Sequence, residues 1–357
     1  MKSLLYIGND FSEKGGRQQL SFLNHSVLKK IFGEYFYSFL LRKKATPNFS
    51  KKLKSVFGYI DGIEQSSFLS IENVLIEKKI NMIFFDGSNF GKLTKKIKEK
   101  YPDIRIFTFF HNVESKFFLG SFLARKNLNS LLVLIVNYLM EKNSCKFSDN
   151  LICLNRIDSS DLFKIYKRNC DFIIPMYLED QLTNKKIKTN PHRDYCLFVG
   201  GDFYANYHGI KWFVDNVFDK VKLDLVIIGR GMDKYKTEFG SNSRIRVLGE
   251  VESLEDWYKN CKFVIAPIFD GSGMKTKVAE ALMYGKTVIG TPDAFAGYGE
   301  YFDVENYVCQ SKDEFIRKIV ALEVDDFLPV NDSLREIYIK NFSFESSTLR
   351  FRKALSM

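Results

Sequence analysis

Short apolar runs alternate with amphipathic segments along the chain, and this alternation restricts the fold more than any other feature of the sequence. Between residues 18 and 32, for example, apolar side chains recur at positions 20, 23, 27, 28 and 31, which is the spacing of an amphipathic helix. Strands that alternate with helices are typical of an α/β fold with a parallel, doubly wound sheet. The runs that we interpret as strands are 4–7, 35–41, 81–85, 104–110, 151–154, 172–175, 195–199, 225–228, 245–248, 263–268 and 287–289.

The length and the uneven charge of the chain indicate two domains. A chain of 357 residues is longer than one ordinary core requires. Residues 1–190 contain 31 Lys and Arg against 18 Asp and Glu, whereas the remainder contains 22 against 25, so the halves carry net charges of opposite sign. We interpret the polar, lysine-rich segment 179–193 as the linker between the domains.

The sequence disfavours secreted, disulfide-rich and membrane-spanning proteins. No run of about 18 apolar residues is present, and the start MKSLLYIGND is expected to be a first strand rather than a secretory signal. The stretch Leu131–Met140 is expected to form a buried or interfacial helix. Six Cys without CxxC spacing predict neither disulfides nor a metal centre, which favours a reducing cytoplasm.

Basic clusters at 42–44, 51–54 and 92–100 account for part of the charge of the first half. Such clusters are either solvated helix faces or surfaces that meet polyanions. No nucleic-acid motif accompanies them, so an anionic membrane surface is the preferred partner, and nucleic acid is not expected.

A glycine-rich turn between an apolar run and a helix indicates an anion site at 269–291. The turn Gly271–Gly273 follows the strand 263–268, and Lys275, Lys277 and Glu280 come next on an expected helix. Backbone N–H groups at a helix N-terminus favour negative charge, and two lysines add full positive charges. Phosphate is the anion that such a site holds most often.

Three sequence features of the first half fall at the carboxyl ends of predicted strands, where ligands of doubly wound sheets bind. They are the pair Gly15-Gly16, Asp86 and His111. The first glycine loop lacks the GxGxxG spacing, so a nicotinamide cofactor is not implied. A lone His is often structural, but the position of His111 favours a functional interpretation.

Several segments, taken in order, resemble retaining glycosyltransferases of family 4. The segments are the Gly15-Gly16 loop after the first strand, HNVE at 111–114, CLNRIDSSDL at 153–162, FVGGDFYANYHGIKWFVDNV at 198–217, LVIIGRG at 225–231, VLGEVESLEDWYKNCKFVIAP at 247–267 and GSGMKTKVAEALMYGKTVIGT at 271–291. The resemblance implies a GT-B fold, in which two Rossmann-like doubly wound domains face each other across a deep cleft. It places an acceptor-binding domain at 1–185, a donor-binding domain at 186–340, and a C-terminal helix at 341–357 that packs on the first domain.

The resemblance also assigns roles to residues that match the family. Glu280 would accept hydrogen bonds from the ribose hydroxyls of a nucleotide, because a carboxylate offers only acceptors. Lys275 and Lys277 would hold the diphosphate and stabilise it as it leaves, while His111 would bond a hydroxyl of the transferred sugar. These four residues form the predicted catalytic set. The predicted donor-binding residues are Gly15, Gly16, Gly201, Arg230, Asp270, Gly271, Ser272 and Gly273.

The sequence departs from the family at two places. Ser272 stands where many members carry the first of two glutamates, and Asp270 is the nearest carboxylate that would replace it. Gly201 and Asp202 stand where many members carry an Arg and a Lys, so holding the diphosphate would fall mainly to Lys275 and Lys277.

The function implied is transfer of a hexose-type sugar from a nucleotide-diphosphate donor to a glycan or polyprenyl-diphosphate-linked acceptor, with retention of the anomeric configuration. Neither a cofactor nor a metal is expected, since no DxD-type motif is present. Bacterial O-antigen or capsule synthesis at the cytoplasmic, inner face of the membrane is the implied setting. The alternatives are a catalytically impaired nucleotide-sugar-binding protein, an inverting GT-B transferase or epimerase, and, from the basic pI alone, a nucleic-acid-binding protein.

Overall fold

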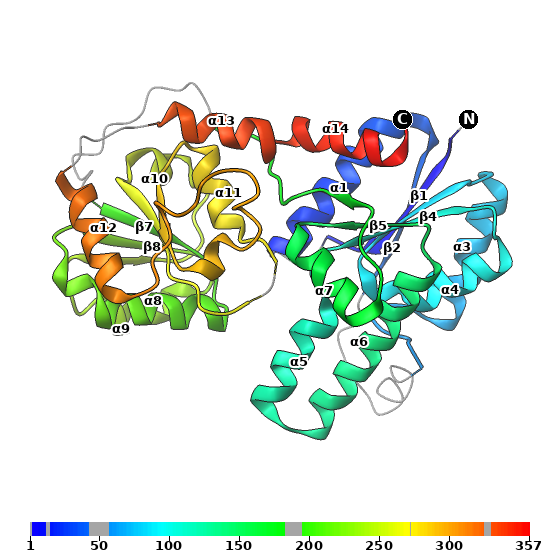
Figure 1. Cartoon of the computed structure of the whole chain (residues 1–357), viewed down its shortest axis with the longest axis horizontal. Coiled ribbons are helices and arrows are strands. Elements are labelled where there is room, and N and C mark those ends of the chain that lie inside the picture. Colours follow the sequence, from blue (N-terminus) through cyan, green and yellow to red (C-terminus); the bar gives the residue numbers. More distant parts are fainter. Residues whose placement is uncertain (1, 12–14, 43–56, 183–194, 272, 325–329) are drawn as a thin grey trace. The chain divides into compact units, whose positions relative to one another are not determined.

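The structure is a computed structural model that describes residues 2–11, 15–42, 57–182, 195–271, 273–324 and 330–357. It divides into two compact units (Figure 1). Unit 1 comprises residues 1–175 and 347–357, and unit 2 comprises residues 176–346. The division after Pro175 precedes the boundary expected at 185. Most of the predicted linker, together with the basic clusters at 43–44 and 51–54, lies outside the described residues.

Unit 1 contains a six-stranded parallel sheet in the order β2-β1-β3-β4-β5-β6. The strands are β1 (Leu4–Asn9), β2 (Phe36–Leu41), β3 (Met82–Asp86), β4 (Arg105–Phe110), β5 (Asn150–Cys153) and β6 (Phe172–Ile173). The helices are α1 (Gly16–Phe32), α3 (Gln65–Glu77), α4 (Gly91–Lys100), α5 (Glu114–Arg125), α6 (Leu128–Phe147), α7 (Arg156–Tyr166) and α14 (Phe344–Leu355), of which the part from Ser347 belongs to this unit. The prediction of a parallel α/β sheet is confirmed.

Helices cover both faces of this sheet, which explains why its strands are apolar without alternation. Successive side chains of β3 point to opposite faces. Phe84 packs on Phe351 of α14 with ring centroids 5.9 Å apart, whereas Phe85 packs on Phe90, beside α4, at 6.0 Å. The C-terminal segment from Ser347 is therefore part of the core of unit 1.

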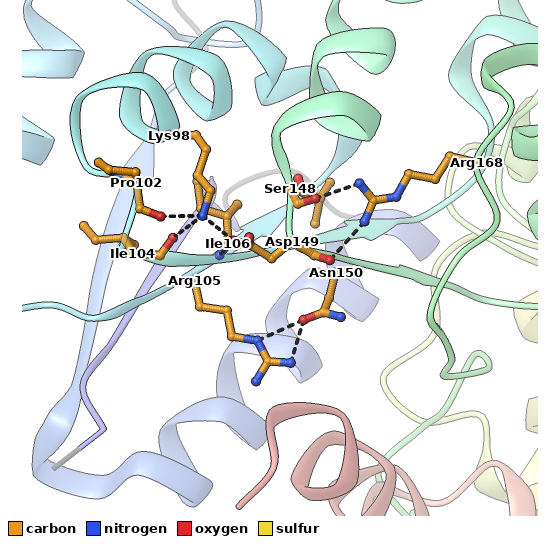
Figure 2. Close-up of polar contacts among 10 residues, drawn as sticks. Lys98, Pro102, Ile104, Arg105, Ile106, Ser148, Asp149, Asn150 and Arg168 are labelled. Atoms are coloured by element: carbon orange, nitrogen blue, oxygen red, sulfur yellow. Dashed lines mark hydrogen bonds and ion pairs between the residues drawn. The ribbon is translucent and has the colours of Figure 1, made fainter.

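A polar cluster secures the ends of α4 and α6 at the edge of the sheet where β4 and β5 begin (Figure 2). Lys98 Nζ donates to Asp149 Oδ2 at 2.9 Å, and the same carboxylate oxygen accepts from Ile106 N at 2.8 Å. Arg168 donates to the carbonyls of Cys145 and Ser148 at 2.7 and 2.8 Å, at the C-terminus of α6. A cation at this position complements the helix dipole.

Part of the basic cluster 92–100 on α4 is therefore used inside the unit. Lys98 belongs to this polar cluster, Lys100 pairs with Glu72, and Lys92 donates to the carbonyl of Phe57. These contacts indicate a structural use of the three lysines, while an anionic partner for the cluster stays a prediction.

Unit 2 contains a five-stranded parallel sheet in the order β11-β10-β7-β8-β9. The strands are β7 (Tyr195–Val199), β8 (Asp224–Ile228), β9 (Ile245–Leu248), β10 (Phe263–Ala266) and β11 (Val288–Gly290). The helices are α8 (Tyr204–Asn216), α9 (Lys236–Phe239), α10 (Glu255–Asn260), α11 (Thr276–Met283), α12 (Lys312–Val324) and α13 (Asp332–Asn341). Gly209 lets α8 pack closely beside β10, because a Cβ at this position would lie 1.8 Å from the carbonyl oxygen of Pro267.

Among the described residues, no helix is both long enough and apolar enough to cross a bilayer.

Candidate functional site

The strand order of unit 2 has its switch point between β7 and β10. The chain leaves β7 toward β8 and β9 on one side, and leaves β10 toward β11 on the other. Ligands of open α/β sheets bind beyond the carboxyl ends of the two strands at such a point. The segments at this place are the loop before α8 and the glycine-rich turn before α11.

The glycine-rich turn has a backbone that requires glycine and a lysine that holds it. Gly271 and Gly273 have φ angles of 111° and 68°, in a region that residues with a Cβ rarely adopt. Lys275 Nζ donates to the carbonyls of these two glycines at 3.0 and 2.9 Å. The sequence predicted that Lys275 would lie on the helix, but in the structure it is the N-cap of α11. Ser272 lies outside the described residues.

Lys277 is buried on α11 and connects this helix to α8. Its Nζ donates to Asn206 Oδ1 at 2.9 Å and lies 4.2 Å from the centroid of the Phe198 ring. Burial lowers the pKa of Lys277 to about 7, with Lys275 adding to the effect and Glu280 opposing it. Burial makes the charged form of this lysine unfavourable, and a nearby anion would stabilise that form.

Glu280 lies on the same helix, one turn after Lys277, and is partly buried. Tyr258, whose side chain is fully buried, donates its hydroxyl to Glu280 Oε2 at 3.0 Å. Burial raises the pKa of Glu280, while Tyr258 and Lys277 oppose the rise. The tyrosine fixes one carboxylate oxygen and so defines the direction in which the carboxylate points.

The other predicted donor-binding residues of unit 2 also follow strands at this edge of the sheet. Gly201 follows β7, and its carbonyl accepts from Asn206 Nδ2 at 3.0 Å. Arg230 follows β8 and is exposed. Asp270 follows β10, is exposed, and accepts from the hydroxyl of Tyr204 at 2.7 Å. The structure thus brings the described members of the unit 2 set to one edge, and their roles stay predictions.

A buried polar cluster surrounds His111 in unit 1, just after β4. His111 Nε2 lies 3.2 Å from Asp86 Oδ2, at the end of β3, and 3.4 Å from Ser21 Oγ of α1. Asn24 Nδ2, also on α1, donates to Asp86 Oδ1 at 2.7 Å. Burial by itself raises the pKa of Asp86, but His111, Ser21 and Asn24 together lower it to about 2. Asp86 is therefore ionised at neutral pH.

The Asp86 carboxylate sets the hydrogen-bonding direction of His111. An ionised carboxylate facing Nε2 favours the tautomer that carries its proton there. Nδ1 of His111 is buried, and among the described residues it has no hydrogen-bond partner. His111 thus has one nitrogen that faces Asp86 and Ser21, and one for which the described residues supply no hydrogen bond.

Gly15 and Gly16 begin α1, on the same unit as His111. Gly15 is the N-cap in an extended conformation, Gly16 is the first helical residue, and both are exposed. Arg17 follows them and pairs with Glu114 of α5 at 2.8 Å. Residues 12–14, the rest of the predicted loop, lie outside the described residues.

Several residues that shape the site were not identified from the sequence. Three contacts join site residues to segments that are distant in the chain, and no local pattern marks them. The pairs are Asn206 with Lys277, Tyr258 with Glu280, and Tyr204 with Asp270. Asn24 does leave a signal, because it is a polar residue on the apolar face of α1.

The described residues contain no cluster of three or more His, Cys, Asp or Glu that could hold a metal ion. The expectation that neither metal nor cofactor is needed stays a prediction.

Comparisons with known proteins agree with this description. Residues 193–325 match the family described as Glycosyl transferases group 1. No curated protein matches the chain. Solved structures with the same fold include sucrose-phosphate synthase from Thermosynechococcus elongatus, with 13% identity over 99% of this chain and 98% of that one and a TM-score of 0.75.

Two further structures cover nearly the full length. HepE from Anabaena, in complex with UDP-glucose, has 11% identity over 100% of both chains and a TM-score of 0.66. The lipopolysaccharide outer core galactosyltransferase WaaB, in its apo form, has 14% identity over 99% of both chains and a TM-score of 0.63. At these identities the likeness shows the fold, and the prediction of a GT-B fold with two Rossmann-like domains is confirmed.

The family match lies in the unit that carries Lys275, Lys277 and Glu280. Together with the fold, it supports a glycosyltransferase enzyme, and the sequence prediction is confirmed at that level. Membership of family 4 stays a prediction.

Proposed function

We propose that the protein transfers a sugar from a nucleotide-diphosphate donor to a glycan hydroxyl with retention of the anomeric configuration. The observation that carries this proposal is the set formed by the glycine-rich turn, Lys275, Lys277 and Glu280 at the switch point of unit 2. The set combines cations and a helix N-terminus with a carboxylate one turn away. A nucleoside diphosphate needs both kinds of group, because its phosphates are anionic and its ribose hydroxyls are donors.

The donor occupies unit 2 in this proposal. Glu280 accepts hydrogen bonds from the ribose hydroxyls, and Tyr258 keeps the carboxylate in place. Lys277 and the N-terminus of α11 neutralise the diphosphate, while Lys275 also keeps the turn in shape. UDP-glucose is the first donor to consider, because HepE from Anabaena holds it in a structure of the same fold.

His111 acts on the sugar rather than on the nucleotide. Its Nδ1 is the atom that hydrogen-bonds a sugar hydroxyl, and Asp86 is the positioning residue that faces Nε2. This arrangement orients the sugar without supplying a nucleophile.

In the transfer step, the bond from the anomeric carbon to the phosphate oxygen breaks, and its electron pair stays with the leaving diphosphate. The acceptor oxygen bonds to the same face of the anomeric carbon, and its proton passes to the leaving phosphate oxygen. Lys275 and Lys277 stabilise the charge that develops on the diphosphate.

We infer a setting in bacterial O-antigen or capsule-type synthesis, with an acceptor carried on a polyprenyl diphosphate or glycolipid at the inner face of the cytoplasmic membrane. The structural neighbour WaaB is a lipopolysaccharide outer core galactosyltransferase. The basic first half of the chain favours an anionic surface.

A second candidate is a nucleotide-sugar-binding protein with impaired catalysis. Ser272 favours it, since a serine does not supply the carboxylate that many similar transferases carry at this position.

The two candidates differ in turnover. We expect release of nucleoside diphosphate from at least one of a panel of UDP-, GDP- and ADP-hexoses when a lipid-linked glycan is added. The anomeric coupling of the product in NMR then reports retention. Nucleotide binding without turnover on any donor would favour the impaired protein, and an inverted product would favour an inverting transferase.

The variant His111→Ala tests the role proposed for His111 in the same assay. Turnover is expected to fall about 10²-fold, as for loss of one preorganised polar contact in a transition state. Nucleotide affinity is expected to stay unchanged, because His111 and the nucleotide-binding set are on different units. An equal fall in affinity would contradict the role proposed for His111.

From the lowered pKa of Lys277, we predict that the protein takes up a proton when it binds a nucleotide above neutral pH. The Lys277 pKa of about 7 leaves much of the free protein with a neutral amine at about pH 8. A bound diphosphate favours the charged form, so affinity for UDP is expected to fall as pH rises through this range. Calorimetry at about pH 8 in buffers of different ionisation enthalpy measures the uptake. Lys277→Met should abolish it, and a binding heat that does not depend on the buffer would contradict the prediction.

A further inference from the structure

Helices α5 and α6 form a hairpin, residues 114–147, that presents an apolar face to solvent. The two helices lie side by side and reach away from the sheet of unit 1 (Figure 1). Exposed aliphatic side chains recur along both helices at intervals of three or four residues, at 119 and 123 on α5 and at 128, 132, 135 and 139 on α6, so each helix presents one stripe. The exposed apolar side chains of the hairpin are Leu119, Leu123, Leu128, Leu132, Val133, Ile135 and Leu139.

These side chains are substantially exposed, with 58% of Leu123 and 72% of Leu128 accessible. Exposed apolar side chains gathered in stripes on one hairpin mark an interaction site more often than singly scattered ones do.

The charged residues in the part of the hairpin that carries the exposed apolar side chains are all basic. Residues 115–140 contain no Asp or Glu. Arg125 and Lys126 are exposed at the tip, and Lys142 is exposed near the base. Lys116, also near the base, pairs with Asp161 of α7 at 2.6 Å. The two glutamates at the base, Glu114 and Glu141, are buried. The face is therefore apolar with a basic rim.

The base of the hairpin is firmly held, so the exposed leucines do not result from loosely packed helices. Glu141 of α6 accepts from the backbone N–H groups of Glu114 and Ser115 at 2.9 and 3.0 Å, which satisfies the N-terminus of α5. The same carboxylate accepts from Ser88 Oγ at 2.9 Å and from the hydroxyl of Tyr166 at 2.8 Å.

The C-terminus of α6 is held as well. Arg168 donates to two of its last carbonyls, as Figure 2 shows for Ser148. Both helices are thus anchored at the base by buried or charge-assisted hydrogen bonds.

The sign of the rim distinguishes between possible occupants. A second copy packed through the same face in a symmetric dimer would bring its own basic rim close to this one. The segment 115–140 has no acidic residue to compensate that repulsion. An anionic lipid surface matches both properties, because it offers acyl chains to the leucines and headgroups to the basic side chains.

We propose that the α5–α6 hairpin docks the protein on an anionic bilayer. The helices lie in the interface, with the leucine stripes at the level of the upper acyl chains and with Arg125 and Lys126 at the headgroups. This inference rests on the membrane setting of the proposed function and assigns it to one element. Since α5 begins directly after the turn that contains His111, docking would hold the predicted acceptor side of unit 1 close to lipid-linked substrates.

The test is co-sedimentation of the full chain with vesicles, without donor or acceptor. The protein is expected to bind vesicles of phosphatidylcholine with phosphatidylglycerol, and to bind pure phosphatidylcholine less well. The variant Leu123→Glu/Leu128→Glu should reduce the binding at least about tenfold, since it places two charges in the apolar face. Arg125→Gln/Lys126→Asn should reduce binding only to the anionic vesicles, by about fivefold for each residue, and should weaken its dependence on salt.

A matched control comes from α3 of the same unit. Leu69 and Ile76 are 61% and 63% exposed, so Leu69→Glu/Ile76→Glu adds the same charge at comparable exposure outside the hairpin. This control should bind vesicles as the unchanged protein does. Three results would overturn the proposal. The hairpin variant could bind vesicles as well as the unchanged protein, or the α3 control could lose as much binding as the hairpin variant. The unchanged protein could also fail to bind anionic vesicles. A hairpin variant that abolishes a dimer in solution would instead indicate a second copy as the occupant.

UDP binding by unit 2, measured on the same samples, separates this proposal from the proposed function. Loss of vesicle binding with UDP affinity retained supports the hairpin. Vesicle binding by a protein that binds no nucleotide would leave the hairpin proposal standing and remove the transferase.

Discussion

The double change Lys275→Ala/Lys277→Ala is expected to lower turnover at least about 10³-fold, because it removes both cations from the proposed diphosphate site. The two lysines do different things in the free protein. Lys275 secures the glycine-rich turn, whereas Lys277 is buried between Asn206 and the Phe198 ring. The effect should appear in turnover and in affinity for UDP, measured by release of nucleoside diphosphate and by calorimetry.

The single variants should separate these tasks. Lys277→Met keeps a long apolar chain in a buried position, and it should lower UDP affinity with little loss of stability. Lys275→Met removes the donor to Gly271 and Gly273, so it should also lower the melting temperature of the unliganded protein.

Lys220→Ala/Lys222→Ala is the control for the double change, because both lysines are exposed on unit 2 before β8. It should leave turnover unchanged. Turnover of the Lys275→Ala/Lys277→Ala variant within about tenfold of the unchanged protein would contradict electrostatic stabilisation by these residues.

The strands of both sheets were predictable because helices cover both of their faces. Such strands must be apolar without interruption, and the run 81–85 marks β3 almost to its ends. The glycine-rich turn was predictable for a similar reason, since positive φ angles at Gly271 and Gly273 need a residue without a Cβ.

The partners of the site residues were not predictable in the same way. A buried lysine requires an acceptor, but nothing in the sequence near Lys277 shows that the acceptor is Asn206, 71 residues away. Asp86 and His111 could be placed at neighbouring strand ends, yet Ser21, beside His111, and Asn24, which donates to Asp86, both come from α1. These contacts follow from packing over long distances in the chain.

For the apolar helix of the hairpin, the sequence alone did not show which side chains are buried. The composition of 131–140 predicts a buried or interfacial helix, and both alternatives have the same sequence pattern. Only the packing of α6 shows which of its side chains are covered. Val136 and Met140 are buried, whereas Leu132, Ile135 and Leu139 are exposed.

Glu280→Gln is expected to raise the KM for the donor and to lower kcat/KM about 10²-fold, as for loss of charge-assisted hydrogen bonds to ribose hydroxyls. The change keeps the size of the side chain and an oxygen that accepts from Tyr258, so the fold should be unaffected. Glu238→Gln, on exposed α9, removes a carboxylate from the same unit and should leave kinetics unchanged.

The pH dependence of donor binding provides an independent check of the carboxylate. Burial raises the pKa of Glu280, and the protonated carboxyl loses acceptor capacity, so affinity for UDP should fall on the acid side, starting above the pH at which an exposed Glu titrates. An amide does not titrate there, so Glu280→Gln should remove this acid limb while lowering affinity at neutral pH. If the limb persists in the variant, its cause is another group; if affinity at neutral pH is also unchanged, Glu280 does not hold the ribose.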